Sequence, residues 1–163
     1  MSLPSLFHHA RLFSALALAL MVAACAGQNQ DANGLGVGAA VPGSQQDFSV
    51  NVGDRVLFLE DQSTLTPEAQ AILEKQAIWL RQYPQYVFTI EGHADERGTR
   101  EYNLALGARR AATVRDFLVA RGISQTRMKT ISYGKERPVA TCDSETCWTQ
   151  NRRAVTALGG PGT

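Results

Sequence analysis

The sequence lacks a hydrophobic run long enough to cross a membrane, although its first residues are strongly apolar. Its first apolar run, Leu12 to Val22, is shorter than the roughly 20 residues that a membrane-spanning helix needs. The run follows a segment whose only charged residue is Arg11, and small residues come after it. This pattern is typical of a cleaved export signal. We therefore expect residues 1–24 to be a signal peptide and not part of the fold.

A cysteine stands directly after the small residues that follow this run. The sequence Val22-Ala23-Ala24-Cys25 resembles the lipobox of bacterial lipoproteins, which implies lipidation of Cys25. An ordinary cleavage site with an incidental cysteine is the alternative. Acyl chains would anchor the protein firmly, because each buried CH₂ contributes about 0.8 kcal/mol. Ala26 is not the aspartate that resembles an inner-membrane retention signal, so we expect the outer membrane, with the domain facing the periplasm.

The mature chain also lacks an excess of charge and a set of metal-binding side chains. The whole sequence carries 16 basic and 15 acidic residues, and loss of Arg11 with the signal leaves the rest formally neutral. That balance argues against a nucleic-acid partner. Of three histidines only His93 lies beyond the signal, which excludes a multi-histidine metal site. We expect no metal and no cofactor.

Two cysteines, Cys142 and Cys147, remain beyond Cys25. An even pair in an exported, oxidising compartment is typical of a disulfide, and we predict that these two residues pair. Closing so short a loop contributes roughly 2 kcal/mol at most. The bond is therefore expected to shape the loop before Trp148 more than to stabilise the domain.

The mature chain divides into a polar segment and a longer segment with a regular hydrophobic pattern. Residues 26–47 are rich in Gly, Ala, Asn and Gln and have too little apolar surface to pack. We expect residues 25–47 to be the lipidated cysteine and a flexible tether. Residues 48–158 are enough for one compact domain, and residues 159–163 form a short tail.

Within the domain, strand patterns and helix patterns follow one another. Strands are predicted where short apolar or β-branched runs are bounded by turn residues, at 55–59, 86–90, 128–132 and 153–158. One helix is predicted from the Thr66 N-cap to Pro84, and another over 100–121. Segments 92–98 and 133–151 are expected to be a turn and a loop.

The spacing of apolar residues also indicates how the elements pack. The second helix is expected to bury the residues spaced three or four apart along it, namely Leu104, Ala108, Ala111, Val114 and Leu118. The element order predicts an α/β fold, a two-layer sandwich of the form β-α-β-α-β-β. Both helices would pack on one mixed sheet.

The polar turn after the second strand begins a longer motif. It reads GHADERG at 92–98 and continues to Asn103 and to Arg109-Arg110-Ala111, and Asn151-Arg152-Arg153 follows near the last strand. These elements, in this order, resemble the OmpA-like peptidoglycan-binding domain. The sequence SYGKERP at 132–138 is similar to the lipoprotein members of that family, and the resemblance covers about residues 49–158.

The resemblance implies a function and partners. That family binds the meso-diaminopimelate residue of uncrosslinked wall peptide, and its lipoprotein members partner the Tol system, including TolB, in envelope integrity and cell division. It therefore implies a tether between the outer membrane and peptidoglycan that is not an enzyme. The adjacent acids Asp95 and Glu96 do not straightforwardly provide the carboxylate separation of about 5 to 9 Å that a glycosidase needs. A scaffold lipoprotein that binds only periplasmic proteins is the alternative.

The residue types fit that ligand. The free end of diaminopimelate displays an ammonium and a carboxylate, for which Asp95 supplies an acceptor and Arg110 a planar donor fork. Asn103 lies two helical turns before Arg110 and can offer its amide to the ligand or to the turn. A turn-capping Asp95 and a surface salt bridge of Arg110 are the alternatives. Replacing either charge is expected to weaken binding while the melting temperature stays near that of the wild type.

Neighbouring residues are assigned supporting roles. Glu60 and Asp61 follow the first strand and are expected at the same rim, where the resemblance implies contacts partly through backbone amides. Leu59 stands where the family commonly has an aspartate, so only its backbone is expected to contribute. His93 is interpreted as a structural residue that hydrogen-bonds the turn. The Asn151-Arg152-Arg153 run is interpreted as a salt-bridge brace for the rim.

Overall fold

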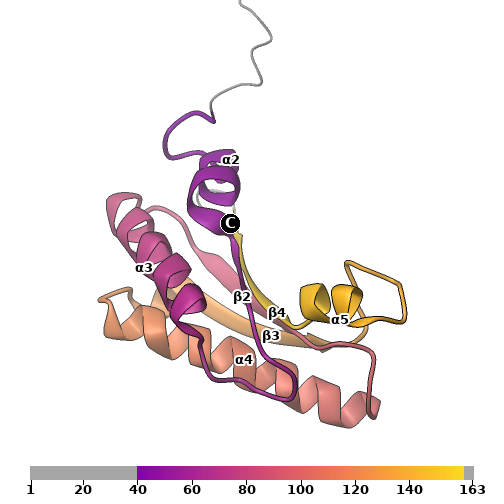
Figure 1. The fold of residues 1–163 in the computed structure, drawn as a ribbon. Helices are drawn as coiled ribbons and strands as arrows, with labels where there is room; N and C mark the ends of the chain where they lie inside the picture. Colours follow the sequence, from indigo (N-terminus) through magenta and orange to yellow (C-terminus); the bar gives the residue numbers. More distant parts are fainter. Residues whose placement is uncertain (1–39, 160–163) are drawn as a thin grey trace, which may run out of the picture. The chain divides into compact units, whose positions relative to one another are not determined.

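A computed structural model describes residues 40–159 and contains one four-stranded sheet in the order β1-β4-β2-β3 (Figure 1). Its strands are β1 (Arg55–Leu57), β2 (Phe88–His93), β3 (Met128–Gly134) and β4 (Arg153–Leu158). β2 is parallel to β3, whereas β4 is antiparallel to both of its neighbours, β1 and β2. The sheet is therefore mixed, as predicted.

Two long helices, α3 (Pro67–Gln82) and α4 (Arg100–Ala120), pack on the sheet and on each other. α3 begins at its predicted cap, where the Thr66 hydroxyl accepts the N–H of Ala69, and it ends before Pro84. α4 begins where the Thr99 hydroxyl accepts the N–H of Tyr102. The predicted α/β sandwich and the positions of both helices are confirmed.

The hydrophobic core lies between these two helices and the sheet. It draws residues from both helices and from all four strands, so that no single element could bury its apolar face alone. Its most deeply buried large aliphatic members are Val56, Leu73, Leu80, Ile90, Val114 and Leu118.

The predicted buried face of α4 is wrong in its first half. Leu104 and Ala108 are exposed, whereas Asn103, Leu106 and Arg110 are buried. The helical spacing is kept, but polar side chains take buried positions here. They do so because this part of the helix faces backbone carbonyl groups of nearby loops, which need hydrogen-bond donors.

Two other segments are more ordered than predicted. β2 continues to His93, beyond the predicted end at 90, because Gly92 pairs with residues of both β3 and β4. The predicted turn therefore begins at Ala94. The predicted loop 133–151 contains a short helix, α5 (Glu145–Asn151), which lies apart from α3 and α4 in Figure 1.

The packed domain also begins earlier than residue 48. Residues 40–47, predicted as the end of the tether, include a short helix, α2 (Gln45–Asp47), which leads into a π-helical turn, η1 (Phe48–Gly53). The Asp47 carboxylate accepts the indole N–H of Trp79 at 2.8 Å, and the Gly43 carbonyl accepts the hydroxyl of Tyr86 at 2.8 Å. These polar contacts fix a segment whose composition alone predicts flexibility.

The predicted signal, Cys25 and most of the predicted tether lie outside the described residues. Across residues 40–159, no helix combines the length and apolarity that spanning a membrane requires.

β2 and α4 approach each other most closely at two glycines, Gly92 and Gly107. A Cβ atom on Gly92 would overlap the Gly107 carbonyl group, and one on Gly107 would lie 2.8 Å from the Gly92 carbonyl oxygen. Asp95 and Arg110 each follow one of these glycines by three residues. The glycine contact therefore sets the separation of the two elements that carry the predicted site.

We expect Gly92→Ala to lower the free energy of unfolding by about 3 kcal/mol, because the new methyl group forces the backbones of β2 and α4 apart. Gly122→Ala is the control, since Gly122 has φ +85° but open space around it, and should cost only about 1 kcal/mol. Urea denaturation measures both. Equal losses in the two variants would show that the close approach does not constrain the fold.

Candidate functional site

A hollow of about 270 Å³ lies where the loops after β1 and β2 meet the first half of α4. Its lining combines three acidic side chains and two arginines with smaller or less polar residues: Glu60, Asp61, Asp95, Arg97, Gly98, Tyr102, Asn103, Leu106 and Arg110. Every residue predicted to contact the ligand is among them. The structure therefore brings together side chains from three separate segments of the chain.

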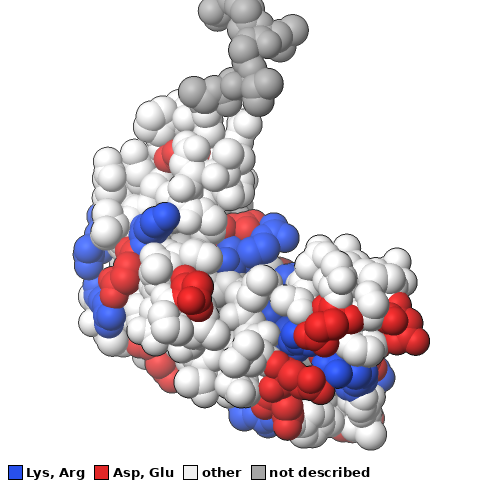
Figure 2. Space-filling view, in the orientation of Figure 1, with Lys and Arg blue, Asp and Glu red and all other residues white. Residues whose placement is uncertain are grey.

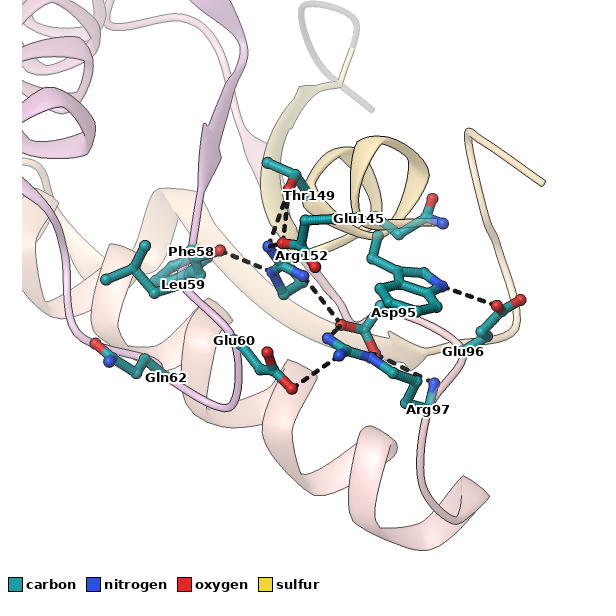
Figure 3. A network of polar contacts seen from close by, with 12 residues as sticks. Phe58, Leu59, Glu60, Gln62, Asp95, Glu96, Arg97, Glu145, Thr149 and Arg152 are labelled. Atoms are coloured by element: carbon teal, nitrogen blue, oxygen red, sulfur yellow. Dashed lines mark hydrogen bonds and ion pairs between the residues drawn. The ribbon is translucent and has the colours of Figure 1, made fainter. Parts of the chain in front are cut away.

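Asp95 lies in the turn after β2 and is nearly buried. Its Oδ2 atom is 2.7 Å from Nη2 of Arg97 and 3.4 Å from Nη1 of Arg152, and Oδ1 accepts the backbone N–H of Arg97 (Figure 3). Burial alone would raise the pKa of Asp95, but the hydrogen bonds from Arg97 hold that pKa below its usual 3.8. Asp95 is therefore an anion at neutral pH.

Arg110 is completely buried, which excludes the alternative of a surface salt bridge. Its Nε donates to the Gln62 carbonyl at 2.8 Å, Nη1 to the His93 carbonyl at 2.8 Å and Nη2 to the Leu59 carbonyl at 3.1 Å. A guanidinium has five N–H groups, so two more can serve a ligand in the hollow that Arg110 lines. The side chain ties both loops to α4.

Burial lowers the pKa of Arg110 to about 10, so its charge persists at neutral pH. The structure revises the expectation that Arg110→Ala leaves the melting temperature near that of the wild type. The truncation would remove the donor from three carbonyl groups and open a cavity, both of which destabilise a fold.

Asn103 supports the turn. Its buried Nδ2 donates to the Arg97 carbonyl at 2.7 Å, which holds the segment that follows Asp95. Of the two options left open by the sequence, the ligand or the turn, the free domain uses the turn. The Asn103 side chain also lines the hollow.

The loop after β1 forms the opposite rim. Glu60 pairs with Arg97 at 2.8 Å, and the Asp61 carboxylate contacts the Tyr102 hydroxyl. Asp61 has φ 54°, the only positive φ of a non-glycine residue in the part of the chain that is described. The Leu59 side chain is about half exposed, and its carbonyl accepts from Arg110. The Leu59 backbone thus helps to hold Arg110, and its contact with a ligand stays a prediction.

Arg152 braces Asp95 from the side of α5. Its guanidinium donates to the Phe58 carbonyl at 3.2 Å and to the Thr149 hydroxyl at 2.9 Å, and it pairs with Glu145 and Asp95 (Figure 3). Of the Asn151-Arg152-Arg153 run, Arg152 forms the predicted salt-bridge brace, whereas Arg153, among the described residues, donates only to the backbone carbonyls of Asn151 and Arg137. The structure also shows that the brace depends on α5.

A disulfide links the first turn of α5 to the loop before it. Cys142 and Cys147 are joined as a disulfide, with Cα atoms 5.6 Å apart. The indole N–H of Trp148 on α5 donates to the Glu96 carboxylate at 2.8 Å, and the Arg97 guanidinium lies 4.2 Å from the centroid of the Trp148 ring. The disulfide therefore lies beside the residues that hold the Asp95 turn.

Several residues around the hollow are not predicted by the sequence. Arg97 stands inside the GHADERG motif, and its position directly after Asp95 and Glu96 is the available signal. Tyr102 lies one residue before Asn103, in the first turn of α4. Trp148 and Glu145 reach the rim from α5, a helix too short to show hydrophobic periodicity.

Charges of both signs lie close together in this part of the molecule. Figure 2 shows acidic and basic side chains next to one another below α5, whereas the region around α2 carries few charges. The hollow itself has an excess of one acidic side chain over its arginines. Such an arrangement suits a ligand that carries a cation and an anion together.

His93 is buried, and its ring lies 5.5 Å from the ring of Tyr133. Within residues 40–159 neither ring nitrogen has a hydrogen-bond partner, so the predicted bond from its side chain to the turn is wrong. The His93 residue contributes to the site through its backbone carbonyl, which accepts a hydrogen bond from Arg110. Burial, and secondarily the charges of Arg153 and Arg137, lower the pKa of His93 to about 4.

This pKa predicts a loss of stability in mild acid. The unfolded chain binds a proton on His93 near pH 6.5 and the folded chain only near pH 4, so stability falls as the pH drops through that window. We expect a loss of about 2 kcal/mol between pH 7 and pH 5. His93→Leu should remove most of it, since the sequence beyond the predicted signal has no other histidine. Urea denaturation of the wild type and of His93→Leu at both pH values measures these losses. An equal loss of stability in the two proteins would contradict the prediction.

Comparisons with known proteins agree with the fold and the motif. The model of the OmpA family matches residues 57–152. The peptidoglycan-associated lipoprotein of Rhizobium meliloti is 63% identical over 91% of this chain and 87% of that protein, and that of Brucella melitensis is 63% identical over 91% of each. The crystal structure of the peptidoglycan-associated lipoprotein from Burkholderia pseudomallei has a TM-score of 0.66 at 39% identity, covering 70% of this chain and 98% of that one.

Proposed function

Because this chain belongs to the OmpA family, and within it to the peptidoglycan-associated lipoproteins, we propose that its domain binds peptidoglycan non-covalently through the diaminopimelate residue of the stem peptide. Membership of this family agrees with the prediction that the chain is not an enzyme. One observation supports the choice of ligand group: Asp95 and Arg110, the predicted partners of its ammonium and carboxylate, line the same hollow.

Each end of the ligand head group meets suitable chemistry. The ammonium would bind the Asp95 carboxylate, which is ionised at neutral pH, and the acidic Glu60 and Asp61 lie on the same hollow. The carboxylate would bind the two N–H groups of Arg110 that the carbonyls of the rim do not use. Asn103 would keep the turn in place and border the ligand.

We propose further that Cys25 carries the lipid that anchors the protein in the outer membrane, with the domain in the periplasm. The lipobox-like Val22-Ala23-Ala24-Cys25 and the names of the relatives as lipoproteins support this. The protein would thereby link the outer membrane to the wall within the Tol-Pal system, together with TolB and other Tol proteins, and serve envelope integrity and cell division.

The alternative is a scaffold lipoprotein that binds only periplasmic proteins. The hollow favours the wall ligand, because it combines an ionised carboxylate with a charged, buried arginine and not an apolar surface. Sedimentation with purified peptidoglycan separates the two functions. Binding without release of soluble muropeptides supports the wall ligand, and absence of sedimentation supports the scaffold.

We expect Asp95→Asn to weaken wall binding by about 2 kcal/mol or more, because it removes the partner of the ligand's ammonium. Asp116→Asn, which removes an exposed carboxylate outside the hollow, is the matched control and should bind as the wild type does. Asp95→Asn is preferable to Arg110→Ala, which is expected to destabilise the fold as well. Wild-type affinity in Asp95→Asn would remove the support for this site.

A change in the ligand tests the other half of the site. Amidating the diaminopimelate carboxylate removes the anionic partner of Arg110 and leaves the ammonium for Asp95, so binding should weaken but not disappear. Equal binding of amidated and free walls would contradict the role of Arg110.

Replacing Cys25 tests the anchor. Cys25→Ser is expected to release the protein from membranes and to lower its mass by that of the lipid. Fractionation with the outer membrane at an unchanged mass would rule out lipidation at this residue.

A further inference from the structure

Arg97 lies across the hollow between two acidic side chains from different loops. Its Nη2 is 2.7 Å from Oδ2 of Asp95, its Nε is 3.3 Å from Oδ1 of Asp95, and its Nη1 is 2.8 Å from Oε1 of Glu60 (Figure 3). In the free domain, the carboxylate assigned to the ligand's ammonium therefore already holds a cation. Both of its oxygens accept hydrogen bonds from Arg97.

A ligand ammonium that binds Asp95 must take the place of one of its present partners. Arg152 is a poor candidate, because its side chain is only 5% exposed and is held by the Phe58 carbonyl and by residues of α5. The side chain of Arg97 is 34% exposed and forms part of the wall of the hollow. Arg97 is therefore the cation that can leave.

Arg97 has other partners to keep when it leaves Asp95. Its guanidinium already lies over the Trp148 ring, and Glu60 is paired with it from the opposite rim. The bond from the Trp148 indole to Glu96 fixes the ring in this position. A cation over a Trp face is stabilised even where it is partly exposed to solvent. When Arg97 moves away from Asp95, it therefore gives up one of its several contacts, and its charge stays paired.

We propose that Arg97 is an internal competitor for the ligand's ammonium: it occupies Asp95 in the free domain, and binding exchanges one cation for the other. This inference rests on the proposed function. The exchange keeps Asp95 paired at every stage, so a nearly buried carboxylate is never left without a counter-ion. It also lowers the affinity for the ligand, because each binding event must break the pair between Arg97 and Asp95.

The sign of a mutational effect tests the exchange. The full-length mature protein in detergent is titrated with a soluble stem peptide that carries meso-diaminopimelate with its distal amine and carboxylate free. Arg97→Ala should bind this peptide about fivefold more tightly than the wild type, since a partly exposed ion pair no longer has to be broken. Arg100→Ala is the matched control: it removes an exposed arginine of α4 outside the hollow, and it should change the affinity by less than about twofold.

A double-mutant cycle separates competition from a general effect of charge. In an Asp95→Asn background, Arg97→Ala should change the affinity by less than about twofold, because no carboxylate remains for which the two cations compete. Weaker binding of Arg97→Ala would overturn the exchange and indicate that Arg97 contacts the ligand. An unchanged affinity, or an equal gain in both backgrounds, would overturn it as well.

A spectroscopic measurement tests the same movement in the unmutated protein. The NMR signal of the Arg97 Nε–H should move on addition of the stem peptide in the direction in which Asp95→Asn moves it without ligand. Ligand binding that leaves this signal in place would overturn the exchange and leave the proposed function intact. A wild type that does not bind the stem peptide at all would contradict the proposed function itself.

Discussion

The buried guanidinium of Arg110 is the interaction on which the rest of the site depends. Enclosing a charge in a fold is unfavourable unless its hydrogen-bonding capacity is used, and here three backbone carbonyl groups use it. Those carbonyls belong to the loop after β1 and to the end of β2. One side chain of α4 thereby fixes both rims of the hollow, and its remaining N–H groups can serve a ligand there. Arg110 therefore serves both the stability of the fold and the proposed binding of the ligand.

The close packing of two backbones determines how far apart β2 and α4 lie. Gly92 and Gly107 let β2 and α4 approach until a carbonyl group of one element nearly touches the other. The same approach brings the Asp95 turn within reach of α4, where Asn103 holds it through the Arg97 carbonyl. Arg152 fixes Asp95 from the α5 side. The carboxylate is thus positioned by hydrogen bonds from several elements, as a preorganised binding site requires.

Much of the fold could be predicted because its signals are local. The Thr66 cap and Pro84 bound α3, and alternating strand and helix patterns predict the layered sheet. Asp95, Asn103 and Arg110, which line the hollow, could be predicted to lie together because they belong to one ordered motif. The spacing predicts that Leu104 lies in the core, yet polar neighbours take the buried positions. The carbonyl groups that Arg110 binds come from distant parts of the sequence, so the spacing does not indicate them.

The parts that could not be predicted depend on long-range contacts. Gly92 disfavours a strand by its own propensity, and only its pairing with two neighbouring strands extends β2. Trp148 reaches Arg97 across about 50 positions of the sequence, from a short helix that a disulfide links to the loop before it. The segment that contains Asp47 joins the domain through hydrogen bonds from the Trp79 indole and the Tyr86 hydroxyl. Composition and periodicity carry no information about such contacts.

The central claim is that the hollow reads an ammonium and a carboxylate on one ligand group. Isothermal titration with two soluble stem peptides, identical except for meso-diaminopimelate or lysine at the third position, tests it most directly. Lysine keeps the ammonium for Asp95 and lacks the carboxylate for Arg110, so its peptide should bind at least about tenfold more weakly. Equal affinities for the two peptides would contradict the account.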